Sequence, residues 1–281
     1  RPLSHGPCAM SLTEFSSAEA LSPSLREKDP GQNVLLVIPT YNEVGNIELL
    51  LREIAAEHLG VDILVIDDHS PDGTGQVAER LSAQIPVQVM HRGAKRGIGS
   101  AHKDGFTYAM DHGYTHVMTM DADFAHAPSA LRAMLSQASS VEVVIGSRYL
   151  QGGGLAGWTL IRRMISSTAH WLTTHLLKLP YDCTGGFRVY RVASLKRLEY
   201  RRIKSDGYAF LIEMVVRLRE CGCSIQEIPI VIPVRNQGTS KISRYEILQA
   251  MATLLRLSLQ RVGRGSAAVI RRDAVDEVHG T

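Results

Sequence analysis

Short runs of branched apolar residues alternate with helix-length amphipathic segments through the first half of the chain, and this alternation strongly constrains the fold. Such runs, bounded by polar or turn-forming residues, are typical of strands buried on both faces. Strands are predicted at Val34–Ile38, Ile63–Ile66, Val87–His91, Thr115–Met120 and Val141–Ile145. Because strands that alternate with helices join through right-handed crossovers, the chain is predicted to be an α/β protein with a parallel sheet.

The segments around this pattern suggest the domain organisation. Helices are predicted at 44–59 and 75–84 and from Gly99 to about His112, and a late strand at 225–234. Residues 1–33 are rich in Ser, Pro and charge, without periodicity, and are predicted to be a disordered tail. One large domain is expected over 34–244, followed by an amphipathic helix over 245–264 and a frayed tail over 265–281.

Polar segments follow the predicted strands where those strands end. They read PTYNE at 39–43, DDHSPDG at 67–73, the loop 92–99, and DADFAH at 121–126. Each has a purely structural explanation, because Asp, Pro and Gly form turns and cap helices. The loop 92–99 could alternatively cradle a phosphate on free backbone N–H groups. Parallel sheets bind ligands beyond the carboxyl ends of their strands, so the gathering of acidic and aromatic groups there favours a ligand site.

Asp121–Ala122–Asp123 is the segment that most directly indicates chemistry. The apolar run 117–120 stops at these two carboxylates, which would repel each other unless a cation lay between them. Hard oxygen ligands suit Mg²⁺ or Mn²⁺, and Mg²⁺ takes one or two protein carboxylates and completes its shell with substrate phosphates. The spacing therefore suggests a metal-bridged diphosphate, and the alternative is a solvated Asp turn.

Charge is distributed unevenly although the net charge is only +3. Residues 151–264 hold 18 Lys and Arg against 7 Asp and Glu, a balance of +11, which leaves −8 on the remainder. A basic second half indicates an anionic partner such as lipid headgroups or phosphate, and solvated helix faces explain part of the imbalance. Nucleic acid is not the expected partner, because aromatic residues make up only 6% and the sheet rim is acidic.

Composition supports a reducing, cytoplasmic setting. Hydrophobic residues make up 44% and charged residues 21%, as in ordinary globular proteins, and no long uninterrupted apolar run predicts a membrane span. The four cysteines lack C-x-x-C pairs and any regular disulfide framework, so free thiols are expected. They are Cys8, Cys183, Cys221 and Cys223.

Six motifs in one order resemble glycosyltransferase family 2, and within it the polyprenol-phosphate (dolichol-phosphate) mannosyltransferases. They are PTYNE, IDDHSPDGTG, DADFAHAP, GSRY, DCTGGFRVY at 182–190 and GTSKIS, and the resemblance runs from Val34 to Arg244. It implies a GT-A fold, a Rossmann-like and mostly parallel sheet flanked by helices. It also implies inverting transfer of mannose from GDP-mannose to a polyprenyl phosphate, with Mg²⁺ or Mn²⁺ as cofactor.

The resemblance assigns roles residue by residue. Donor-binding positions are Pro39, Tyr41, Glu43, Ile66, Asp68, Ala122, Arg148, Arg235 and Lys241, together with the metal-binding Asp121 and Asp123. Acceptor-phosphate positions are Arg148, Arg162 and Ser166, which with Asp123 are the expected catalytic residues. The chain departs from the pattern at Ala125, where many relatives carry a metal-contacting Gln; water could fill that position, or His126 could approach it.

Two apolar and basic segments are candidates for helices at a membrane interface. Residues 158–179 and 245–262 both combine apolar residues over much of the helix circumference with Arg. Periodicity alone fits a core or dimer helix equally well for the first, and the second could dock on the first helix or bind lipid or a membrane-anchoring partner protein. The protein is expected to lie peripherally at the cytosolic face of a membrane.

The expected chemistry needs no general base. A phosphomonoester is already ionised near neutral pH, so the acceptor requires positioning and charge neutralisation. Two alternatives remain open. One is the same fold with another nucleotide sugar, such as UDP-glucose, or another acceptor; the other is a non-catalytic nucleotide-sugar binder that regulates a membrane complex.

Overall fold

The computed structural model describes residues 33–233 and 249–260. The predicted disordered tails therefore lie outside the described residues, apart from Asn33, and so do Arg235 and Lys241. Within the described ranges the fold is built on one seven-stranded sheet and a separate two-stranded ribbon.

The large sheet has the strand order β3-β2-β1-β4-β7-β5-β8. Neighbouring strands run parallel except for β7, which is antiparallel to both β4 and β5. The sheet is therefore mixed but mostly parallel, as predicted. Its strands are β1 (Val34–Thr40), β2 (Asp62–Asp67), β3 (Val87–His91), β4 (His116–Thr119), β5 (Val143–Ser147), β7 (Arg188–Arg191) and β8 (Ile225–Pro229).

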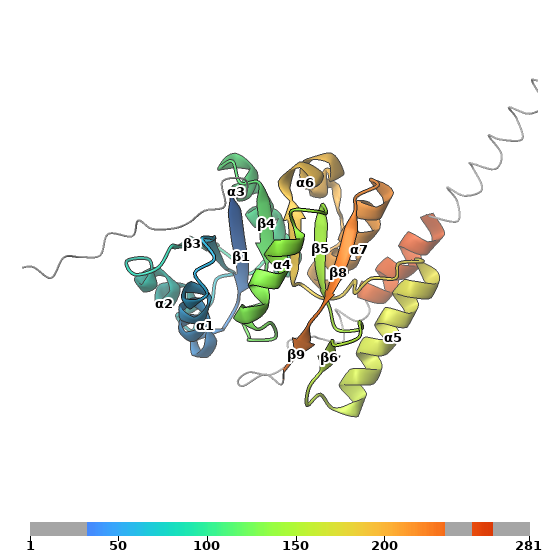
Figure 1. Ribbon diagram of the computed structural model, residues 1–281, viewed down its shortest axis with the longest axis horizontal. Coiled ribbons are helices and arrows are strands. Elements are labelled where there is room, and N and C mark those ends of the chain that lie inside the picture. The colour runs from blue at the N-terminus through green and yellow to red at the C-terminus, as the bar shows by residue number, and fades with distance from the viewer. Residues whose placement is uncertain (1–32, 234–248, 261–281) are drawn as a thin grey trace, which may run out of the picture.

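Helices cover both faces of the sheet (Figure 1). Alternate residues of β1 serve the two faces, with Leu35 and Val37 in one hydrophobic core and Leu36 and Ile38 in the other. On the first face pack α3 (Ile98–Asp111), α6 (Val192–Leu198), α7 (Gly207–Glu220) and the C-terminal helix 249–260. On the second face pack α1 (Val44–Ala56), α2 (Thr74–Leu81) and α4 (Leu131–Gln137).

Strand β7 is the strand of the large sheet that the sequence pattern did not predict. Its first residue, Arg188, is fully buried and therefore breaks the apolar run expected of an inner strand. Backbone carbonyls hold the two terminal nitrogens of the guanidinium, since Nη1 donates to the oxygen of Leu211 at 3.0 Å and Nη2 to that of Cys183 at 2.8 Å, whereas Nε has no hydrogen-bond partner among the described residues. A buried cation can be tolerated only when it is hydrogen-bonded in this way.

The late predicted strand 225–234 divides into two. Its first part is β8, and its second part is β9 (Val231–Ile232), which pairs in parallel with β6 (Gly154–Leu155) in the two-stranded ribbon. The ribbon leads into α5 (Leu160–Leu176), which lies beyond the end of the large sheet near the C-terminal helix 249–260 (Figure 1). None of the helices within the described ranges is both long and apolar enough to cross a membrane.

Close packing of α3 explains two glycines of the chain. A Cβ on Gly99 would lie 2.8 Å from the Phe210 side chain of α7, and a Cβ on Gly105 would lie 2.7 Å from Val37 of β1. Both distances are shorter than real Cβ contacts allow, so only glycine lets α3 approach β1 and α7 so closely. Gly99, a candidate phosphate-loop residue in the sequence, thus has a packing role.

Candidate active site

The acidic turn lies at the carboxyl end of β4, in the middle of the sheet. All of β4 is buried, and the chain continues into Asp121 and Asp123 before Phe124 adopts a positive φ of 58°. Oδ1 of Asp123 accepts a hydrogen bond from the N–H of Ala125 at 3.0 Å, which closes the turn. The Asp121 side chain is 28% exposed, whereas Asp123 is 8% exposed. The strand therefore presents one accessible and one recessed carboxylate.

A first cavity opens beyond the carboxyl ends of β1, β2 and β4. It contains most of the donor residues predicted from the sequence, from Pro39 to Asp123. Ile66 and Arg148 are exceptions, because the side chain of Ile66 is fully buried in the core and Arg148 lines a second cavity instead. The lining residues are Pro39, Thr40, Tyr41, Glu43, Asp68, Lys95, Gly97, Ile98, Ala101, Asp121, Ala122, Asp123 and Tyr208.

The loop 92–99 holds Asp68 in place. The backbone N–H groups of Arg96 and Gly97 each donate to the Asp68 carboxylate at 2.8 Å, and the Arg92 guanidinium lies 2.9 Å from it. These two N–H groups are therefore unavailable to cradle a phosphate, contrary to that alternative for the loop. Instead the loop fixes the acidic wall of the cavity and places Lys95 3.7 Å over the Tyr41 ring.

A second cavity lies between the acidic turn and α5. It contains all three predicted acceptor residues, Arg148, Arg162 and Ser166, and its walls are more apolar than those of the first cavity. Asp121 and Tyr208 line both cavities, so the two meet there. The other lining residues are Ala125, His126, Trp158, Ile165, Ala169, Thr184, Gly185, Gly186, Ile232 and Ala250.

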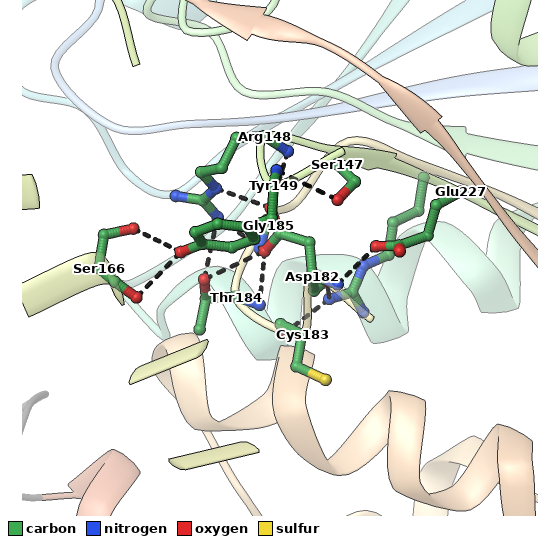
Figure 2. Close-up of polar contacts among 10 residues, drawn as sticks. Ser147, Arg148, Tyr149, Ser166, Asp182, Cys183, Thr184, Gly185 and Glu227 are labelled. Carbon is green, nitrogen blue, oxygen red and sulfur yellow. Dashed lines mark hydrogen bonds and ion pairs between the residues drawn. The ribbon is translucent and has the colours of Figure 1, made fainter. Parts of the chain in front are cut away.

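Arg148 is a firmly held cation of the second cavity (Figure 2). Its Nε and Nη2 donate to the two oxygens of Asp182 at 2.7 and 2.9 Å, and Nη2 also donates to Thr184 Oγ1 at 2.9 Å. Burial opposes its charge, but the Asp182 carboxylate raises the pKa of Arg148. Burial likewise opposes the charge of Asp182, whose pKa the Arg148 guanidinium lowers. Both groups are therefore charged at neutral pH.

Helix α5 brings Arg162 and Ser166 to the cavity. Thr159 caps its N-terminus by accepting from the N–H of Arg162, whose guanidinium lies 3.6 Å over the Trp158 ring. The hydroxyl groups of Ser166 and Tyr149 are 2.7 Å apart (Figure 2). These contacts tie the helix to the loop after β5. The tyrosine was missed in the sequence because no local pattern links positions 17 residues apart.

Comparison with known proteins identifies the family. The model of the family "Glycosyl transferase family 2" matches residues 35–199. The chain belongs to glycosyltransferase family 2. It is 39% identical over 226 residues to polyprenol monophosphomannose synthase of Mycolicibacterium smegmatis, covering 79% of this chain and 85% of that protein. It is 37% identical over 228 residues to undecaprenyl-phosphate mannosyltransferase of Micrococcus luteus, covering 80% and 94%.

Solved structures share the fold at low sequence identity. Glucosyl-3-phosphoglycerate synthase of Mycobacterium tuberculosis, solved with Mn²⁺, UDP and phosphoglyceric acid, aligns with a TM-score of 0.62 at 17% identity, over 81% of this chain and 79% of that one. Mannosyl-3-phosphoglycerate synthase of Rubrobacter xylanophilus aligns with a TM-score of 0.60 at 19% identity, over 84% and 76%. The predicted GT-A type of α/β fold is confirmed at this level.

The carboxylates of this family 2 member could supply only part of the coordination shell of a divalent cation. Within residues 33–233 and 249–260, no group of three or more His, Cys, Asp or Glu side chains is arranged to hold a metal. Two carboxylates beside an open cavity nevertheless match the donor set of Mg²⁺, which completes its shell with substrate phosphates and water. Mn²⁺ accepts the same oxygen ligands.

His126 is poorly placed to replace the missing Gln at Ala125. Its ring is buried, stacks on Phe187 at 4.8 Å, and its Nδ1 accepts from the N–H of Asp121 at 3.3 Å. That nitrogen is therefore committed to the backbone.

Proposed function

We propose that this protein transfers mannose from GDP-mannose to a polyprenyl phosphate, forming polyprenyl phosphate mannose and GDP. The observation that carries the proposal is the meeting of the two cavities at Asp121 and Tyr208. Glycosyl transfer requires donor and acceptor to converge at one point, one in a polar cavity and one in an apolar cavity with cations. The names of both bacterial relatives, which combine mannose with a polyprenol or undecaprenyl phosphate, support these substrates.

The first cavity is assigned to the nucleotide sugar. Pro39, Tyr41, Glu43, Asp68 and Ala122 surround the nucleoside and sugar, and the fixed orientation of Asp68 supports recognition of a base. Asp121 and Asp123 would hold Mg²⁺ or Mn²⁺, which neutralises the charge that develops on the leaving diphosphate. Ile66, Arg235 and Lys241 keep their donor assignments from the family resemblance alone.

The second cavity is assigned to the lipid phosphate. Arg148, Arg162 and Ser166 offer two cations and a hydroxyl to an ionised phosphomonoester, while Ile165 and Ile232 offer apolar walls to the first isoprene units. A phosphate oxygen forms a bond to the anomeric carbon as the bond from that carbon to GDP breaks. Acceptor and leaving group then lie on opposite faces of the sugar, so the configuration inverts.

We infer that α5 and the helix 249–260 rest on a membrane surface at its cytosolic face. Both helices contribute apolar residues to the wall of the lipid cavity, Ile165 from α5 and Ala250 from the second helix, and both also expose apolar side chains outside it. The free thiols of Cys183, Cys221 and Cys223 fit a reducing compartment. A membrane-anchoring partner protein could use the same surface. The exposed residues are Leu160, Ile161, Met164, Ile165, Trp171 and Leu176 of α5, and Met251, Leu255 and Leu259 of the second helix.

Flotation with anionic liposomes tests this surface. Leu160 and Ile161 are 77% and 72% exposed, so replacing both with Glu should leave the fold intact but greatly reduce co-flotation. Leu49→Glu, at a residue of α1 that is 56% exposed, is the matched control and should float like the wild type. Equal flotation of all three proteins, or none in the wild type, would reject the membrane assignment.

Product identification tests the reaction itself. Purified protein is incubated with a polyprenyl phosphate, a divalent ion, and either GDP-mannose or UDP-glucose. Polyprenyl phosphate mannose should form only with GDP-mannose. Product from UDP-glucose instead would favour the same fold with another donor, and binding of a nucleotide sugar without any transfer would favour a regulator.

A further inference from the structure

We propose that Asp182 is a positioning residue that aims Arg148 at the acceptor phosphate, an inference that rests on the proposed function. Asp182 does not line either cavity and is 1% exposed, so it acts through Arg148 rather than by touching substrate. The family resemblance assigned Asp182 no role beyond membership of the motif 182–190.

The hydrogen bonds of Arg148 divide its guanidinium into a fixed edge and an available edge. Nε and Nη2 are committed to Asp182 and Thr184 (Figure 2). Nη1 forms no hydrogen bond with a described residue, and Arg148 lines the second cavity. A guanidinium carries five N–H donors in a rigid fork, so fixing one edge also fixes the direction of the remaining donors. The pair therefore presents a preoriented Nη1 to an anion.

Asp182 is itself held from several directions. Its Oδ1 accepts from the N–H of Gly185 at 3.2 Å, and its own N–H donates to Oε1 of Glu227 at 2.6 Å (Figure 2). Glu227 lies on β8, which pairs in parallel with β5, the strand that leads into Arg148. The clamp thus joins the ends of two neighbouring strands. A carboxylate anchored to strands can hold an otherwise flexible arginine more rigidly than a surface partner could.

Removal of the Asp182 charge has two opposite consequences for an anionic ligand. If Asp182 only supplied charge, its loss would make the cavity more positive and would strengthen phosphate binding. If it orients Arg148, its loss lets a long side chain sample several rotamers and weakens binding. The sign of the change in acceptor affinity therefore distinguishes a positioning role from a simple electrostatic one.

The test is Asp182→Asn, which keeps the side-chain shape but replaces one carboxylate oxygen with an NH₂ group that cannot accept from the arginine. Farnesyl phosphate binding is followed by the fluorescence of Trp158 in the cavity wall, with transfer kinetics in parallel. We expect the Kd for farnesyl phosphate and the acceptor KM to rise, and kcat/KM for the acceptor to fall about 100-fold. The KM for GDP-mannose should remain near the wild-type value, because Arg148 does not line the first cavity.

A double-mutant cycle separates positioning from general destabilisation. In an Arg148→Lys background, Asp182→Asn should cost much less activity, because the partner that it orients is already gone. Thr184→Val, which removes one bond to the same guanidinium, should change the acceptor KM in the same direction but less. Glu142→Gln is the matched structural control. Glu142 accepts hydrogen bonds of 2.8 Å from both Arg197 and Ser194 but lines neither cavity, so its replacement should leave the acceptor KM unchanged.

Each outcome bears on the proposal. Tighter farnesyl phosphate binding in Asp182→Asn, equal losses in both backgrounds, or parallel changes in donor and acceptor KM would each overturn it. If the Asp182→Asn variant fails to fold, the acceptor KM of Thr184→Val tests the proposal instead. An unchanged acceptor KM in that variant would reject the orientation of Arg148 by its hydrogen bonds. A wild-type enzyme that transfers no mannose would instead refute the proposed function, so the two failures are distinguishable.

Discussion

Gly186 sets the position of the Asp121 carboxylate, and Gly186→Ala should displace it. An added Cβ at this residue would lie 3.0 Å from Oδ1 of Asp121, about 0.4 Å short of the 3.4 Å at which ordinary contact begins. The backbone of Gly186 cannot easily retreat, because its carbonyl accepts a hydrogen bond of 2.5 Å from the buried hydroxyl of Thr119. The flexible carboxylate must therefore move instead.

The size of this movement determines the expected effect. Ligand distances in metal sites vary by only about 0.2 Å, so a shift of about 0.4 Å exceeds the tolerance of a cation bound through Asp121. We expect the divalent-ion concentration needed for half-maximal transfer to rise about tenfold, which corresponds to about 1.4 kcal/mol. The global stability should change by less than about 1 kcal/mol, because the clash is relieved at a partly exposed side chain.

The assay is a Mg²⁺ and Mn²⁺ titration of mannosyl transfer, with thermal unfolding of each variant measured alongside. Gly154→Ala is the control, since a Cβ there would meet no atom within 4 Å. It should behave like the wild type in both measurements. A Gly186→Ala enzyme with an unchanged ion requirement would refute the reasoning that this glycine positions the carboxylate.

Two further predictions concern a carboxylate and a histidine. Asp123→Ala should abolish transfer and leave the circular dichroism spectrum native; near-normal turnover would contradict the role of this carboxylate. Burial lowers the pKa of His102 from 6.5 to about 4. Between these two pH values the unfolded chain therefore binds a proton at His102 and the folded chain does not. Stability should thus fall from pH 6.5 to pH 4, by at most about 3 kcal/mol from this group. Urea titrations should show a shallower decline in His102→Leu, and identical slopes would reject this account.

Local sequence patterns were enough to predict the parallel part of the sheet and the edge that carries the chemistry. Strands β1, β2, β4 and β5 are built on apolar runs, which are a local signal of burial, whereas β3, with the sequence VQVMH, is only partly buried. Because ligands bind beyond the carboxyl ends of parallel strands, the placement of Asp68, Asp121 and Asp123 on one cavity followed from strand order along the chain. The family resemblance added Arg148, Arg162 and Ser166 as expected acceptor residues, and the structure brings the three together in the second cavity.

Only the tertiary structure decided how these residues are held. Antiparallel β7 has no apolar run to reveal it, yet its insertion between β4 and β5 places the segment just before it beside both the acidic turn and Arg148. The contact of Gly186 with Asp121 and the pairing of Asp182 with Arg148 join positions far apart in the chain. Hydrogen bonds and steric limits of this kind depend on distances in space, which the periodicity of a sequence does not encode.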